Sequence, residues 1–172
     1  VFWKRAGGAW RYRTLFDEFP LTMAAEWPVQ VSFAEAQAYA TWKGRDLMTE
    51  AEYHRAAEGA PFGDPSCANI GFSNWAPTPV GLYLGGASRH GVLDLVGNGW
   101  EWTKTRFAPF PGFTAWARTY PGYSADFFDE HHYVMLGGSF ASDASLTRRS
   151  FRNWFQPHYP YVFAKFRCVR RA

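Results

Sequence analysis

The stretch from Gly97 to Thr103 combines residue types that could do chemistry. Two glycines free the backbone, two tryptophans favour burial, and Glu101 lies between the tryptophans. Glycine costs about 1 kcal/mol in a helix relative to alanine. We therefore expect a sharp turn pinned in the core rather than a helix or a plain strand. In such a turn the charge of Glu101 needs a partner, because an unpaired buried carboxylate is costly.

One partner could be a metal ion. Asp94 precedes Glu101 by seven positions, and Gly97 and Gly99 lie between them. Calcium prefers oxygen ligands, partly from the backbone, on a loop that can wrap around it. The alternative, equally well supported by the residues alone, is that Glu101 accepts hydrogen bonds from backbone amides in the turn. Nucleophilic catalysis is not indicated, because no Ser or Cys lies in the context of a nucleophile elbow.

A second candidate region joins guanidinium groups, an amide and aromatic rings: Arg148, Arg149, Arg152, Asn153, Trp154 and Phe155. Arginine binds carboxylates through two parallel hydrogen bonds, and an aromatic face attracts a quaternary ammonium group by about 0.5–2 kcal/mol. The pattern therefore suits a small ligand that carries a carboxylate or a cation. Single-stranded nucleic acid would also suit it. A third possibility is a basic strand that pairs with the acids near Asp129.

Charge and composition narrow these possibilities. The net charge of +3, from 18 basic and 15 acidic residues, is too small to imply a polyanionic partner, so we expect no nucleic acid. No apolar run reaches the length of a membrane span, so we expect no membrane partner. Two distant cysteines form no disulfide framework, which favours a reducing, cytoplasmic location.

The five histidines lack the spacing of a catalytic metal site. His131 and His132 are adjacent, so on an extended segment at most one of them faces a given site.

These residues need a scaffold, and the clearest elements are two helices. Ser32 with Glu35 and Thr49 with Glu52 form capping-box patterns, and the helices that follow them end near Gly44 and Gly59. We expect a hairpin over 2–19 and strands at 29–31, 133–138 and 162–169. The rest is irregular, notably 61–91 and 107–128. The fold class predicted is α+β, with two main helices, short antiparallel strands and much loop.

Several motifs resemble those of the formylglycine-generating-enzyme-like (sulfatase-modifying factor) superfamily. Residues 91–103, 136–140 and 166–170 resemble its GLYDMxGNVWEWT, RGGS and GFRxxR motifs, 49–53 resembles LPTEAEWE, and 67–71 resembles ANxG. The resemblance implies an irregular C-type-lectin-like fold over 1–172 as one FGE-sulfatase-like domain. It also implies structural calcium bound by Asp94, Gly97, Gly99 and Glu101, and half of a second calcium site at Asn69. The copper-binding cysteine pair is absent from 140–155, so we do not expect oxidation of a sulfatase cysteine.

Within this superfamily, 109–113 and 151–158 look like the EgtB-like sulfoxide synthases of ergothioneine and ovothiol biosynthesis and their selenoneine-forming relatives. Those non-heme iron enzymes use O2 to join a thiol or selenol to the imidazole of a histidine derivative. Their HxxxHxE iron ligands lie in a DinB-like N-terminal domain, and this motif is missing here. We therefore expect the chain to be the C-terminal half of a longer protein, partnered by an N-terminal domain that binds Fe(II).

The resemblance also assigns roles to individual residues. Asn153, Trp154 and Phe155 would hold the trimethylammonium and carboxylate groups of a histidine betaine such as hercynine. Tyr120 or Tyr123 would be the proton donor, and Arg148, Arg149 or Arg152 would bind the carboxylates of the sulfur or selenium donor. The alternative function is a non-catalytic ligand-binding module of the same fold.

Overall fold

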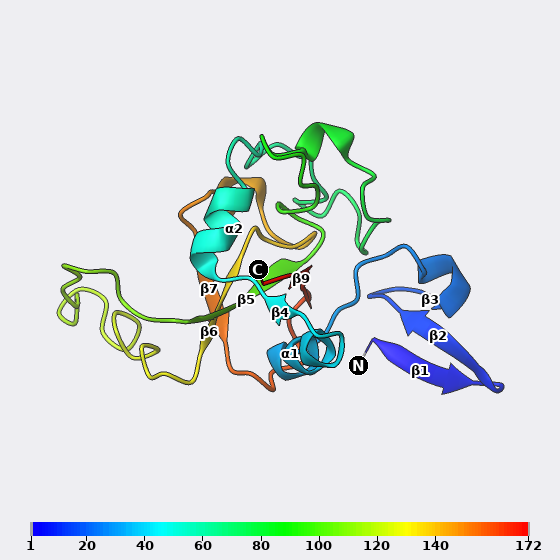
Figure 1. Ribbon diagram of the computed structural model, residues 1–172, viewed down its shortest axis with the longest axis horizontal. Helices are drawn as coiled ribbons and strands as arrows, with labels where there is room; N and C mark the ends of the chain where they lie inside the picture. Colours follow the sequence, from blue (N-terminus) through cyan, green and yellow to red (C-terminus); the bar gives the residue numbers. More distant parts are fainter. Residues whose placement is uncertain (1, 172) are drawn as a thin grey trace.

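The computed structural model describes residues 2–171, in which two α-helices lie among nine short strands (Figure 1). The helices are α1 (Phe33–Trp42) and α2 (Glu50–Ala56). The strands are β1 (Trp3–Ala6), β2 (Ala9–Arg13), β3 (Glu18–Pro20), β4 (Asp46–Leu47), β5 (Trp100–Arg106), β6 (Tyr133–Leu136), β7 (Asn153–Phe155), β8 (Ala164–Lys165) and β9 (Cys168–Val169). Three 3-10 turns complete the regular structure: η1 (Leu21–Ala24), η2 (Leu84–Gly86) and η3 (Ala144–Leu146). The predicted α+β class is confirmed.

Both helices begin at the predicted capping boxes. Ser32 Oγ accepts a hydrogen bond from the backbone N–H of Glu35, and Glu35 Oε2 accepts one from the N–H of Ser32 at 2.8 Å. Thr49 and Glu52 repeat the arrangement at the start of α2. A capping box satisfies N–H groups that would otherwise lack partners, so four local residues fix each start. The N–H of Glu50 also donates to Thr105 Oγ1 at 2.8 Å, which ties α2 to β5.

A four-stranded sheet in the order β7-β6-β5-β8 forms the centre of the fold. Strands β5, β6 and β7 are antiparallel neighbours, and Val134 lies opposite Trp154. β8 pairs with β5 in parallel, an exception to the antiparallel strands predicted, and places Lys165 opposite Glu101. The hairpin β1–β2 and strand β3 form a separate sheet to one side (Figure 1).

Three local predictions were wrong in detail. The turn around Gly97 ends at Gly99, and Trp100 onward is strand β5, because both faces of that strand are buried against apolar side chains. Residues 29–31 form no strand, although the N–H of Val31 donates to Ala164 O at 3.1 Å. The strand predicted at 162–169 is divided into β8 and β9, which pair with strands of different sheets.

Alternate residues of β6 enter two apolar clusters on opposite faces of the central sheet. Met135 packs with Trp100, Trp102 and Phe33 of α1, whereas Val134 and Leu136 pack with a second group that includes Tyr53 of α2. A charged side chain on the central strand β5 is therefore shut off from water on both sides. In residues 2–171 no helix has the length and apolar character that crossing a bilayer requires.

Candidate functional site

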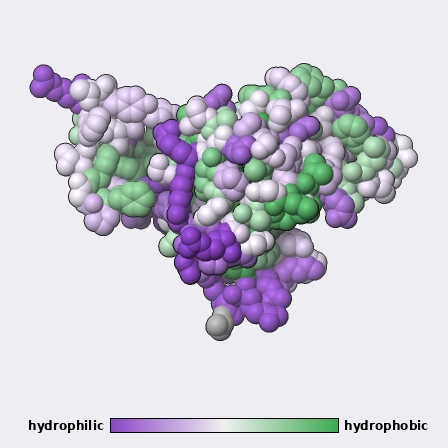
Figure 2. Space-filling model, turned by 90° about the horizontal axis from the view of Figure 1, so that it is seen from above, coloured by the Kyte–Doolittle hydropathy of each residue, from purple (hydrophilic) through white to green (hydrophobic). Residues whose placement is uncertain are grey.

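A pocket of about 590 Å³ lies between β7 and the long loop that connects β5 to β6. Its walls bring together residues that are far apart in the chain: Tyr120, Tyr123, Phe127, His132, Phe151, Arg152, Asn153, Trp154, Phe155, Gln156 and Tyr159. Both predicted tyrosines and the whole predicted Asn153–Phe155 segment are among them. We call it the aromatic pocket. The loop that forms one wall projects from the body as a lobe on the left, with mostly pale to green surface (Figures 1 and 2).

Trp154 is the best-anchored ring of this pocket. It stacks on Phe107 with ring centroids 4.3 Å apart and planes 5° apart. From the loop side, the Phe127 and Tyr123 rings lie 5.5 and 6.1 Å from Trp154. Strand pairing fixes the backbone of Trp154 opposite Val134. Several aromatic rings thus meet at one place, a composition that also occurs in sites that bind organic cations.

Arg152 lines the pocket, but its charge is already balanced. Its Nε lies 2.8 Å from Glu50 Oε1, and its Nη2 donates to Glu50 Oε2 at 3.1 Å. Its guanidinium group also lies over the rings of Phe107 and Phe110, at 4.8 and 4.4 Å. Burial alone would raise the pKa of Glu50, but hydrogen bonding to His54 and the charge of Arg152 hold it below its ordinary value. Arg152 therefore adds little net positive charge to the pocket.

The other two predicted arginines lie outside the aromatic pocket. The Arg148 guanidinium group sits over the ring of Phe151 at 5.4 Å, and Arg149 Nη2 donates to the backbone carbonyl of His54 at 2.7 Å. The structure does not bring them to the residues of β7. Consecutive residues in a turn point in different directions, so composition alone could not place them.

His132 is a pocket residue that the sequence prediction did not single out. Its Nδ1 lies 2.8 Å from Asp129 Oδ1, and its ring is nearly buried against Phe127. The hydrogen bond from His132 is the main reason that the pKa of Asp129 lies below its ordinary value. His131 lines a different pocket, with His158, which confirms that only one of the adjacent histidines faces this site. The signal in the sequence was the aspartate three positions before His132.

Glu101 meets two cationic side chains. It is fully buried, and its Oε2 pairs with Lys165 Nζ while its Oε1 accepts a hydrogen bond from Arg167 Nε at 3.0 Å. Burial would raise the pKa of Glu101, but the charges of Arg167 and Lys165 outweigh this effect and lower it. We call these three residues the Glu101 cluster.

Two of the other predicted calcium ligands, Asp94 and Gly97, also accept hydrogen bonds. The backbone oxygen of Asp94 accepts a hydrogen bond from Lys165 Nζ at 2.8 Å, and its carboxylate accepts one from the N–H of Gly81 at 2.7 Å. The carbonyl oxygen of Gly97 accepts one from the N–H of Gly99 at 2.7 Å. These residues fit a calcium ion poorly, because cationic side chains already contact the carboxylate of Glu101 and the backbone oxygen of Asp94.

Asn69, predicted to form half of a second calcium site, lies between two loops. Its Nδ2 donates to Ala76 O at 3.0 Å and to Asn98 Oδ1 at 3.2 Å, so it joins two loops through amide hydrogen bonds. Within residues 2–171 no group of three or more His, Cys, Asp or Glu side chains could hold a metal ion.

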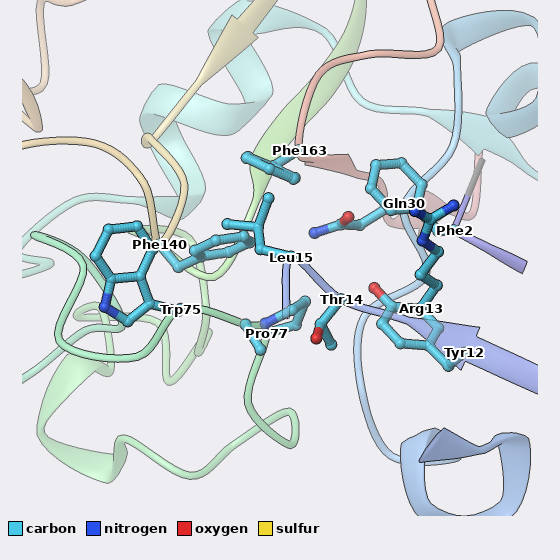
Figure 3. Close-up of a pocket in the computed structure, with 11 residues that line it drawn as sticks. Phe2, Tyr12, Arg13, Thr14, Leu15, Gln30, Trp75, Pro77, Phe140 and Phe163 are labelled. Atoms are coloured by element: carbon cyan, nitrogen blue, oxygen red, sulfur yellow. The ribbon is translucent and has the colours of Figure 1, made fainter. Parts of the chain in front are cut away.

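A smaller cavity of about 240 Å³ lies between the β1–β3 sheet and the body of the protein (Figure 3). Its walls include Phe140, Phe163 and the amide of Gln30. Gln30 Nε2 and Tyr12 Oη are buried without hydrogen-bond partners among residues 2–171, and burial raises the pKa of Tyr12. This cavity shares no lining residue with the aromatic pocket and contains none of the predicted site residues.

The model of one protein family, the sulfatase-modifying factor enzyme 1-like domain (FGE-sulfatase), matches residues 3–172. The chain belongs to this family. This FGE-sulfatase domain is 41% identical over 182 residues to hercynine oxygenase of Mycobacterium tuberculosis, covering 98% of this chain and 41% of that protein. It is 34% identical over 175 residues to ergothioneine biosynthesis protein 1 of Schizosaccharomyces pombe, covering 98% of this chain and 22% of that protein. The chain thus spans less than half of either relative.

The fold resembles that of a solved structure, PvdO from Pseudomonas aeruginosa, with a TM-score of 0.64 and 19% sequence identity. The match covers 95% of this chain and 68% of that one. The predicted FGE-like, C-type-lectin-like fold with two helices and much loop is confirmed for this FGE-sulfatase domain.

Proposed function

We propose that this FGE-sulfatase domain is the substrate-binding half of a non-heme iron, O2-dependent synthase that forms a C–S or C–Se bond on the imidazole of a histidine derivative such as hercynine. The observation that carries the proposal is the aromatic pocket, which contains the whole Asn153–Phe155 segment together with Tyr120 and Tyr123. The similarity to a hercynine oxygenase over 98% of the chain supports the same substrate class.

The pocket suits a trimethylammonium group for two reasons. The faces of Trp154, Phe127 and Tyr123 attract an organic cation, which is worth about 0.5–2 kcal/mol. The charge of Arg152, which would repel a cation, is balanced by Glu50. Side-chain amides on the same wall, from Asn153 and Gln156, can hydrogen-bond the carboxylate and imidazole of the ligand.

A tyrosine of the loop would supply a proton. Tyr120 and Tyr123 both line the pocket, and we favour Tyr123 because its ring is the one that contacts Trp154 and Phe127. Fe(II), bound by an N-terminal domain of the same protein, would supply the O2 chemistry. The residues of this chain would bind and orient the histidine betaine and keep water from its ammonium group. The second substrate would be a thiol or selenol, and the reaction would take place in the cytoplasm without a nucleic-acid or membrane partner.

Binding of trimethylhistidine to the full-length protein tests the proposal. We expect calorimetry with Fe(II) present to show binding, and Trp154→Ala to weaken it about 2- to 30-fold, the equivalent of the cation–π energy. Trp10→Ala is a matched control, because this tryptophan is exposed on the β1–β2 hairpin and should leave the affinity unchanged.

Two outcomes would count against the synthase. A full-length protein that bound neither Fe(II) nor trimethylhistidine would refute it. Tight binding that needs no iron and is followed by no turnover with any thiol or selenol would instead indicate a non-catalytic binding module.

A further inference from the structure

We infer that the ammonium group of Lys165 takes the place of the calcium ion expected at the Glu101 motif, so that a side chain of the protein itself serves as the structural cation. The inference does not depend on the proposed activity. It begins from the mismatch between the motif, which predicts a calcium site, and the Glu101 cluster, which already contains two cations.

Lys165 contacts two of the oxygens that the predicted calcium ion would bind. Lys165 Nζ pairs with Glu101 Oε2 and donates to the backbone oxygen of Asp94 at 2.8 Å. Both oxygens belong to residues of the predicted calcium site. A hard cation such as calcium is bound by carboxylate and backbone oxygens of this kind, and an ammonium group with three donors can satisfy the same oxygens.

The backbone places Lys165 beside Glu101. The parallel pairing of β5 with β8 sets Lys165 directly opposite Glu101, so the lysine reaches the carboxylate from the neighbouring strand. Gly99 leaves room for the lysine stem, because a Cβ at this position would lie 3.3 Å from Lys165 Cγ. Gly97 has φ +73°, and a Cβ there would lie 2.4 Å from the carbonyl oxygen of Asn69. Gly99 thus allows close packing around the lysine, and Gly97 allows close packing against Asn69.

The charges of the Glu101 cluster oppose the binding of a further cation. Lys165 and Arg167 together bring two positive charges to the single carboxylate of Glu101, and Lys165 is only 4% exposed. A divalent ion added to this cluster would face two cationic groups, one of them almost fully buried, and their repulsion would oppose its attraction to the carboxylates of Glu101 and Asp94. The Glu101 cluster therefore joins β5, β8 and the segment around Asp94 at any calcium concentration.

Thermal unfolding of the full-length protein with EDTA or with CaCl2 tests the inference. We expect the wild-type Tm to be the same in both. Lys165→Gly removes the tethered cation and opens its space, so its Tm should fall in EDTA. Calcium at about 100 times its Kd should then raise that Tm by about 5–10 °C.

Lys165→Met is the matched control, because it keeps the stem, lacks the charge and leaves no space for an ion. Its Tm should fall and should not respond to calcium. A wild-type Tm that depends on calcium, or a folded Lys165→Gly protein that does not respond to it, would overturn the inference. If Lys165→Gly does not fold, the calcium content of the purified wild-type protein decides: close to zero per chain supports the inference, and one per chain overturns it.

Discussion

Glu101→Gln should be among the most destabilising single-atom changes in this domain. The substitution keeps the shape of the side chain but leaves Lys165 and Arg167 without the carboxylate that balances them. Removing one partner of a buried ion pair costs about 3–5 kcal/mol. Solvent screening does not reduce this cost, because Glu101 is 0% exposed. At about 2–4 °C per kcal/mol for a domain of this size, Tm should fall by about 6–20 °C.

Calorimetry and urea unfolding measure this loss. Glu18→Gln is the matched control, since Glu18 forms an exposed pair with Lys4 and its substitution should leave Tm unchanged within error. Adding Lys165→Met to Glu101→Gln should recover part of the lost stability. Replacing both partners of a buried ion pair costs less than leaving one of them buried and unpaired. If Glu101→Gln were as stable as Glu18→Gln, the view that this ion cluster holds the sheet together would be refuted.

Three further predictions concern Gly137, the pH dependence of the Glu101 cluster, and Glu50. Gly137→Ala should cost more than about 3 kcal/mol in urea unfolding, since φ is +84° and the new Cβ would lie 2.1 Å from Leu95 O. Folding lowers the pKa of Glu101, so the stability that its charge contributes is present above the unfolded pKa of 4.5 and is lost as pH falls through the folded pKa. The difference in unfolding free energy between wild type and Glu101→Gln should therefore narrow below pH 4.5. Urea unfolding at a series of pH values measures this difference. Glu50→Gln leaves Arg152 unbalanced and should weaken trimethylhistidine binding several-fold, on the order of 1 kcal/mol by calorimetry, whereas equal affinity would show that the charge of Arg152 does not reach the ligand.

The elements that could be predicted from the sequence are those fixed by neighbouring residues. A capping box needs only a hydroxyl and a glutamate three positions later, so Ser32 and Thr49 gave both helix starts correctly. β8 and β9 could not be separated in the same way. Each is two residues long and is defined by its partner strand, β5 or β4, rather than by its own pattern.

In the candidate site, too, the features that depend on residues far apart in the chain could not be predicted from the sequence. Motif resemblance pointed to Trp154 and to Tyr120 or Tyr123, and all three line one pocket. The neutralisation of Arg152 depends on Glu50, 102 positions earlier, and the two partners of Glu101 lie 64 and 66 positions later. No local sequence pattern predicts ion pairs between residues so far apart in the chain. The pairing of Arg152 and of Glu101 could therefore be seen only in the folded structure.

The two walls of the aromatic pocket are held by different means. Backbone pairing to β6 ties down Trp154, whereas Tyr120, Tyr123 and Phe127 lie on the long connection between β5 and β6. Surface connections accept insertions and deletions that sheets do not. A change in the length of this one segment would therefore reshape the wall that faces Trp154 and leave in place the strand pairing that holds the indole.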